Sequence, residues 1–213
     1  MQLYTYFRSS AAYRVRIALN LKGLNADYIP VHLVNNGGEQ HSDAYKAVNP
    51  SELVPTWVED EFQLSQSLSI LEYLNEQHPE VALLPPQDTQ QRALVRAFSL
   101  TIACDIHPLN NLRVLQYLSG TLQVTDEQKT TWYKHWVETG FKTLEALLAQ
   151  SNGKFCFGEQ ATIADCCLIP QFYNALRFNV DLSAYPKIEA IYNHCNTLEA
   201  FKNAAPEAQQ EAA

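Results

Sequence analysis

The chain has 213 residues, a formal net charge of −8 and a pI near 5.2, and 46% of its residues are hydrophobic. This length allows one large domain or two small ones, and the apolar content can fill a substantial core. The acidic balance argues against nucleic acid or an anionic membrane surface as a partner, and no apolar run approaches the roughly 20 residues that span a bilayer. We therefore expect a soluble, cytoplasmic protein without a signal peptide.

The first 80 residues predict an α/β domain. Residues 2–7 alternate as a strand, residues 11–22 form a helix that Gly23 ends, and residues 27–33 form a second strand. A strand, a helix and a strand in succession make a crossover unit, so these two strands should be parallel. TWVE and FQL, joined by a tight acidic turn, then predict an antiparallel hairpin, and the helix that follows ends near Pro79.

The remainder of the chain predicts only helices. Residues 83–91 are rich in proline and polar side chains, so we assign 1–82 to the first domain, 83–91 to a linker and 92–213 to an all-helical second domain. Apolar residues recur at helical spacing over 92–119, 125–150, 162–178 and 186–201. Thr162 and Asp165 fit a capping box at the start of the third of these helices.

The cysteines give no sign of a redox or metal centre. Neither a CxxC pair nor zinc-type spacing occurs among Cys104, Cys156, Cys166, Cys167 and Cys195. Their surroundings are mostly apolar, so we expect reduced, buried thiols and no metal.

Two helix starts in the first domain carry the candidate chemistry. Ser9 and Ser10 precede the first helix, and Gln66 and Ser67 open the last helix of the domain. Either serine of the first pair can simply cap its helix. Two helix N-termini at one sheet edge also form a cradle for a thiolate and a carboxylate. The Val54 backbone, held extended before proline, can pair with a bound peptide. The implied ligand is a small acidic peptide.

These residues match a known family. FRSSAAYRVRIALNLKG, NPSELVP, QSLSILEYL, CDIHPLNNLRVL, TIADCCLIPQ and RFNVDL together resemble the zeta class of glutathione transferases, the maleylacetoacetate and maleylpyruvate isomerases. The resemblance extends to about residue 201. It implies a thioredoxin-like N-terminal domain followed by an all-helical C-terminal domain, with glutathione as the cofactor.

The resemblance also implies which residues form the site. The implied catalytic residues are Ser9, Ser10, Arg8 and Arg177. The residues implied to bind glutathione are Ser9, Ser10, Ala11, Arg14, Gln40, Val54, Gln66, Ser67, His107, Asn111 and Arg113. A cis Val54–Pro55 peptide is implied as well. The EQH stretch leaves open whether Gln40 or His41 contacts glutathione. Arg14 and Arg16 are open between glutathione contacts and structural ion pairs.

One position departs from the family pattern. Many zeta enzymes have SSCSWR where this chain has SSAAYR, so Ala11 replaces a cysteine. The resemblance implies that the reaction does not need this cysteine, because glutathione supplies the sulfur. Ionising a thiol of pKa near 8.5 at neutral pH needs about 2 to 3 kcal/mol. A serine hydrogen bond to a charged acceptor contributes roughly 1.5 to 3 kcal/mol, and a helix N-terminus about 0.3 to 2.

The leading hypothesis is a glutathione-dependent cis–trans isomerase in aromatic degradation, acting on maleylacetoacetate from tyrosine or on maleylpyruvate from gentisate. The substrate is a small dianion, and Arg8, Arg113 and Arg177 are the candidate cations for its carboxylates. A general glutathione transferase and a non-catalytic binding protein are the alternatives. The resemblance implies a homodimer.

Overall fold

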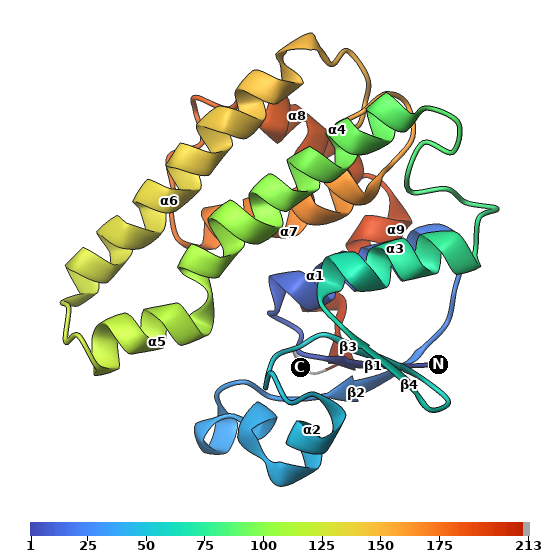
Figure 1. Cartoon of the computed structure of the whole chain (residues 1–213). Helices are drawn as coiled ribbons and strands as arrows, with labels where there is room; N and C mark the ends of the chain where they lie inside the picture. The colour runs from blue at the N-terminus through green and yellow to red at the C-terminus, as the bar shows by residue number, and fades with distance from the viewer. Residues whose placement is uncertain (211–213) are drawn as a thin grey trace. The chain divides into compact units, whose positions relative to one another are not determined.

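The computed structural model describes residues 1–210 and divides into two compact units. The first comprises Met1–Leu83 together with the chain from Asn196 onward, and the second is Leu84–Cys195. Figure 1 traces both along the chain.

The first unit is built on a four-stranded mixed sheet. Its strands are β1 (Gln2–Thr5), β2 (Asp27–Pro30), β3 (Thr56–Glu59) and β4 (Phe62–Ser65), in the order β2-β1-β3-β4. Its principal helices are α1 (Ser10–Lys22), α2 (Asp43–Val48) and α3 (Ser67–Gln77). β1 and β2 are parallel, whereas β3 pairs antiparallel with both β1 and β4. The predicted crossover unit and hairpin are therefore confirmed.

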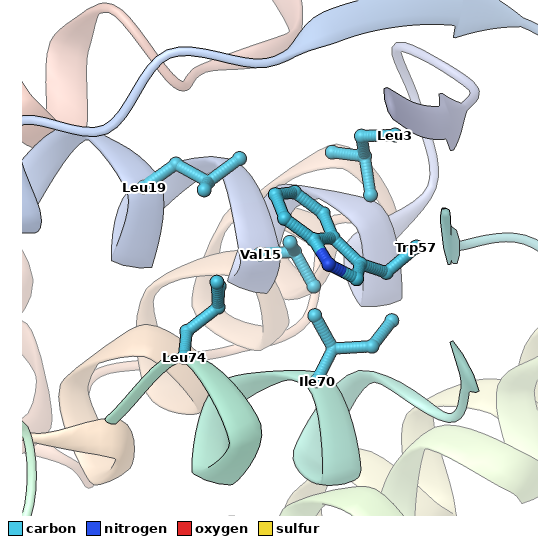
Figure 2. Close-up of a cluster of buried hydrophobic side chains, with 6 residues drawn as sticks. All are labelled: Leu3, Val15, Leu19, Trp57, Ile70 and Leu74. Carbon is cyan, nitrogen blue, oxygen red and sulfur yellow. The ribbon is translucent and has the colours of Figure 1, made fainter. Parts of the chain in front are cut away.

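The two faces of this sheet are covered by different helices, with α1 and α3 on one face and α2 on the other (Figure 1). The core on the first face surrounds the fully buried Trp57, which packs with Leu3, Val15 and Ile70 (Figure 2). Burial of each such side chain stabilises the fold by about 1.5 to 3 kcal/mol. The sheet thus fixes the starting points of α1 and α3, where the candidate site lies.

Residues 196–210 group with the first unit, whereas the sequence predicted them as part of the helical domain, 92–213. The short helix α9 (Glu199–Lys202) packs on α1. Arg16, fully buried in α1, donates from Nε to the Ala204 carbonyl oxygen at 2.9 Å. The predicted continuous helix over 186–201 is interrupted for the same reason, because the chain leaves α8 to reach α1.

The second unit is helical, as predicted. It contains α4 (Thr89–Leu100), α5 (Leu112–Gly120), α6 (Asp126–Leu147), α7 (Ile163–Arg177) and α8 (Pro186–Cys195). The apolar faces of α4, α6, α7 and α8 pack together around a core that includes Phe98, Val137, Phe141 and Phe172. Within residues 1–210 no helix is long and apolar enough to cross a membrane.

The predicted helix over 92–119 is wrong as a single element. After α4 the chain winds into a π-helical segment, Thr101–Ile106, and a 3-10 turn, His107–Asn110, before α5 begins. Pro108 supplies no N–H to a continuing helix, which accounts for the break at this point. Close packing shapes the same segment, since a Cβ on Gly140 of α6 would lie 2.2 Å from Ile106 Cδ1.

The capping box at the start of α7 is confirmed. The Asp165 carboxylate, fully buried, accepts hydrogen bonds from the N–H groups of Thr162 and Cys156, each at 2.8 Å. Burial raises the pKa of the Asp165 carboxyl, and these N–H donors partly offset that effect. Asp165 therefore has a structural role in joining α7 to the loop before it.

All five cysteines are free thiols. Cys104 is exposed, so the expectation of burial is wrong there, whereas the other four are buried as predicted. Burial raises the pKa of Cys156 and of Cys166, and such thiols are poor nucleophiles.

Candidate active site

The N-terminus of α1 presents a hydroxyl and an uncompensated positive potential. Ser9 caps this helix from an extended conformation, with its side-chain oxygen accepting the Ala12 N–H at 3.2 Å. The capping bond uses a lone pair of the Ser9 hydroxyl and leaves its proton available to a bound acceptor. No acidic side chain lies in the first turn of α1. An anion placed here gains from both the hydroxyl and the helix dipole.

The two predicted serines differ in accessibility. Ser9 is half-buried, whereas Ser10, at the first position of α1, is only 5% exposed. Ala11 follows on the first turn and is half-buried as well. The hydroxyl of Ser9 is therefore the better placed of the two to meet a ligand.

The N-terminus of α3 forms the second part of the site. Gln66 occupies the capping position with φ +70° and ψ 113°, and its side chain makes no capping hydrogen bond. A residue other than glycine held at such angles costs about 1 to 3 kcal/mol, and such positions concentrate at functional sites. The side chain of Gln66 is exposed, whereas Ser67 is buried.

Arg14 brings these two helix starts together. Its guanidinium is almost fully buried, and Nη1 donates to the Ser67 hydroxyl at 3.1 Å. This bond places Arg14 beside Ser67, another of the residues predicted to hold glutathione. Arg16 has the structural role instead, because besides Ala204 it donates to Thr5 Oγ1 and to the Phe7 carbonyl oxygen.

The predicted peptide-binding edge lies at Val54. The Val54–Pro55 bond is cis, as the resemblance implies. The preceding carbonyl, that of Leu53, accepts from Tyr45 Oη at 2.6 Å and from Asn49 Nδ2 at 2.8 Å. Within residues 1–210 the N–H and C=O of Val54 make no backbone hydrogen bond. These two groups are thus available to a ligand with peptide character.

Gln40 lies on a 3-10 turn, Glu39–His41, that is tied back to the α1 end of the sheet. The Glu39 carboxylate accepts from the His32 N–H at 2.7 Å, and the His32 ring packs edge-on against Tyr6 at 4.8 Å. Tyr6 in turn accepts the Ser9 N–H at 2.9 Å through its carbonyl oxygen. Gln40 is buried, and its Oε1 has no hydrogen-bond partner within the described chain.

In the second unit, the predicted glutathione residues lie on the turn before α5 and at the start of α5 itself. Asn111 caps α5 by accepting the Arg113 N–H at 3.1 Å, and its Nδ2 lies 3.3 Å from His107 Nε2. His107 and Asn111 are half-buried, whereas the Arg113 side chain is exposed. Asn111 thus links the turn that carries His107 to the start of α5, which carries Arg113.

Helix α6 contacts both the turn that bears His107 and the end of α7 that bears Arg177. Trp132 of α6 donates to the Leu109 carbonyl oxygen at 2.6 Å, which holds the turn bearing His107. The next residue, Tyr133, stacks on Phe178 at 3.8 Å between ring centres, directly after Arg177. Two neighbouring residues of α6 therefore hold the turn that bears His107 and the segment that bears Arg177.

Arg8 and Arg177 are the two exposed catalytic candidates. The Arg8 guanidinium lies 4.9 Å from the centre of the Phe7 ring, and that of Arg177 lies 5.8 Å from the centre of Phe178. Arg177 also donates to Asn174 Oδ1 at 3.3 Å. Both cations rest on aromatic rings with their charge open to solvent.

Several supporting contacts were not anticipated from the sequence. The Arg14–Ser67 bond, the Tyr45 and Asn49 donors behind Val54, and the Trp132 anchor all join residues distant in sequence or on separate elements. Asn49 alone left a signal, in the NP of the NPSELVP stretch. The donors brought together in the first unit suit an anionic peptide-like cofactor such as glutathione.

Comparison with known proteins agrees with this geometry. Residues 3–82 match the family model of the glutathione S-transferase N-terminal domain, and residues 113–204 match that of the C-terminal domain. A probable maleylacetoacetate isomerase of Vibrio cholerae is 50% identical over 210 residues, covering 99% of this chain and 97% of its own. A maleylpyruvate isomerase of Ralstonia sp. is 46% identical over 216 residues, with both chains fully covered.

Solved structures give the same result. The holo structure of a maleylpyruvate isomerase, described as a bacterial glutathione S-transferase of the zeta class, superposes with a TM-score of 0.96 at 45% identity over the whole of both chains. A maleylacetoacetate isomerase of Methylobacterium extorquens AM1, solved with bound malonate and glutathione, has a TM-score of 0.94 at 36% identity, again over both chains in full. The chain therefore belongs to the glutathione S-transferase family, in the zeta class of maleylacetoacetate and maleylpyruvate isomerases.

Proposed function

We propose that the protein is a glutathione-dependent cis–trans isomerase that converts maleylacetoacetate to fumarylacetoacetate or maleylpyruvate to fumarylpyruvate. The observation that carries the proposal is the Ser9 hydroxyl at the start of α1, joined to the α3 start through Arg14 and Ser67. The names of relatives at 50% and 46% identity support the reaction.

The first unit binds and activates the cofactor. Glutathione, when bound, supplies a thiolate that adds reversibly to the cis double bond, so that the carbon–carbon bond can rotate before the thiolate leaves. The Ser9 hydroxyl donates a hydrogen bond to the sulfur and, with the α1 dipole, stabilises the thiolate form. The Val54 backbone, Gln66 and Ser67 orient the peptide. Because glutathione supplies the sulfur, the reaction needs no nucleophile of the protein itself, and Ala11 is compatible with it.

Arginines bind the dianionic substrate. The exposed cations that we assign to the substrate carboxylates are Arg8, Arg113 and Arg177. The planar fork of a guanidinium suits a carboxylate in a bidentate manner. A guanidinium near the ketone oxygen also stabilises the negative charge that develops there when the double bond is attacked.

A substrate assay tests the proposal. Purified protein is given maleylacetoacetate or maleylpyruvate with glutathione, with S-methylglutathione, or with neither. We expect turnover only with glutathione, because the thioether of S-methylglutathione cannot form a thiolate. Arg177→Gln should raise KM at least about tenfold, the equivalent of roughly 1.4 kcal/mol, and Arg177→Lys should raise it less. Conjugation of simple electrophiles without turnover of either dianion would favour a general glutathione transferase instead.

The assembly and location that the resemblance implies form part of the proposal. We infer a cytoplasmic homodimer that acts in the breakdown of tyrosine or of another aromatic compound. Light scattering during gel filtration should give twice the 24.1 kDa of one chain. A monomer mass would overturn the dimer without touching the catalytic assignment.

A further inference from the structure

His41 stands between Gln40 and a carboxylate. Its Nε2 lies 3.0 Å from Gln40 Nε2, and its Nδ1 lies 2.6 Å from Glu52 Oε2. The His41 side chain is about half exposed, whereas Gln40 is 6% exposed. A solvent-accessible titratable ring is thus in direct contact with a buried residue of the predicted glutathione site.

The neutral form of His41 fixes one orientation of the Gln40 amide. The Glu52 carboxylate only accepts hydrogen bonds, so the proton of a neutral ring lies on Nδ1. Nε2 is then an acceptor and takes an N–H from Gln40 Nε2. The Gln40 atom left over is Oε1, which is buried without a hydrogen-bond partner in the described chain. In this state Gln40 offers a ligand an acceptor.

Protonation of His41 favours the opposite orientation of the Gln40 amide. Both ring nitrogens then donate, and the Gln40 amide has to turn over so that Oε1 accepts from His41 Nε2. The turn gives the buried oxygen a partner, which is favourable because its isolation is costly. It breaks only the long bond, 3.5 Å, from Gln40 Nε2 to the Leu33 carbonyl oxygen, and it leaves the amide N–H groups for the ligand. Both carboxylates of glutathione are acceptors and need such a donor.

We propose that His41 is a positioning residue, whose protonated form turns Gln40 to present its N–H groups to a carboxylate of glutathione, so that glutathione binding takes up a proton at His41. The inference rests on the proposed function and adds a pH-dependent control of cofactor affinity. It also joins the two residues between which the sequence left the contact open, with Gln40 touching the cofactor and His41 acting through it.

The charges around His41 suit this role. Glu52 stays ionised as His41 charges, because its hydrogen bond to His41 and the nearby Lys46 lower the pKa of the Glu52 carboxyl. Glu39, on the same turn, is engaged with the His32 N–H. Helix α2, which packs on this turn, also carries Asp43. The other 3-10 turn packed here, Asn35–Gly37, has no charged side chain.

The backbone leaves room for the Gln40 amide only beside a glycine. Gly38 has φ +104°, and a Cβ on it would lie 2.5 Å from Gln40 Nε2 and 2.7 Å from Oε1. The amide therefore lies flat against the bare Cα of Gly38. Exchange of nitrogen and oxygen across this surface changes the chemistry of the site without changing its shape.

The test is calorimetric binding of S-methylglutathione to the whole protein between pH 6 and 8.5. This ligand has no titrating thiol, so ionisation of sulfur does not mask the effect. For the wild-type protein we expect the Kd to rise at least about fivefold from pH 6.5 to 8, towards the limit of tenfold per pH unit for uptake of one proton. Titrations in two buffers of different ionisation enthalpy should show net proton uptake.

Two variants isolate His41. His41→Gln should flatten the pH profile to within about twofold and abolish proton uptake, since glutamine keeps a hydrogen-bonding partner for Gln40 but does not titrate. Glu52→Gln replaces the carboxylate that accepts from His41 Nδ1 with an amide that can also donate, so Nδ1 is no longer held as a donor and the pH profile should change. The amine of the ligand titrates equally with all three proteins.

The outcomes separate this inference from the proposed function. A pH-independent Kd for the wild type, or the same pH profile in His41→Gln, would overturn the role of His41 and leave glutathione binding intact. No binding of S-methylglutathione at any pH would overturn the glutathione site itself, and the role of His41 with it.

Discussion

The guanidinium of Arg14 and the hydroxyl of Ser67 lie 3.1 Å apart, although 53 residues separate them in sequence. One belongs to α1 and the other to α3, so the bond ties the two helix N-termini that form the predicted cofactor site. A buried, charge-assisted hydrogen bond of this kind is worth about 1.5 to 3 kcal/mol. It holds the two helix starts in register before any ligand arrives.

Loss of this bond should weaken cofactor binding as well as stability. We expect Ser67→Ala to lower the free energy of unfolding by about 1.5 to 3 kcal/mol and to raise the Kd for glutathione at least about tenfold. Urea unfolding and calorimetry measure the two effects. Ser69→Ala, an exposed position two residues along α3, is the matched control and should change neither. Equal Kd values for Ser67→Ala and the wild type would remove Ser67 from the site.

The close approach of Gly140 to Ile106 predicts a compensating pair. Gly140→Ala places a methyl group against the Ile106 side chain, and such overpacking costs about 1 to 3 kcal/mol. Because Ile106 directly precedes His107, we also expect the variant to raise KM. Ile106→Ala removes both clashing atoms, Cγ1 and Cδ1, so the double variant should lose less stability, and show a smaller rise in KM, than the sum of the two single variants. Strictly additive losses in the double variant would contradict this contact.

Asp165 should be among the most sensitive positions for stability. Asp165→Ala leaves the buried N–H groups of Thr162 and Cys156 without acceptors, at about 1 to 3 kcal/mol each. Asp165→Asn keeps one acceptor and should lose less. Thermal and denaturant unfolding will rank the two. Asp126→Ala, an acidic residue in the first turn of α6 with its side chain in solvent, should change stability far less than either.

Arg16 should anchor the end of the chain to the first unit. Arg16→Gln removes the donors to Ala204 and Phe7, and we expect a loss of about 2 to 4 kcal/mol by the unsatisfied carbonyl groups it leaves. Limited proteolysis should then cut after α8 more readily. The exposed Arg8, changed to glutamine, should alter stability by no more than about 0.5 kcal/mol. Unchanged protease resistance in Arg16→Gln would contradict the assignment of the C-terminal segment.

Local patterns were sufficient to predict most of the fold. The alternation of residues 2–7, the stop at Gly23 and the TWVE and FQL runs each depend on near neighbours, and they predicted the sheet and its helices. The break in the helix over 92–119 had a local signal in Pro108, but the packing of Ile106 against Gly140 joins two different helices. Sequence periodicity contains no information on such a contact.

The candidate site likewise contains residues that the sequence predicted and residues whose roles depend on distant partners. Ser9 and Gln66 were predicted because helix starts have local signals. The separate roles of Arg14 and Arg16 were not predictable, because both are arginines on one helix turn and only their partners, Ser67 and Ala204, distinguish them. His41 was ambiguous for a similar reason, since its link to Glu52 spans 11 residues.

The most direct test of the account is the ultraviolet titration of the thiol of bound glutathione. The account predicts a midpoint about 1.5 to 2 units below the 8.5 of a free thiol, and a rise of at least about one unit in Ser9→Ala. Thr125→Ala, which removes the cap of α6 instead, controls for loss of a helix cap and should titrate like the wild type. A midpoint near 8.5 in the wild-type protein, or no change in Ser9→Ala, would contradict thiolate formation at the start of α1.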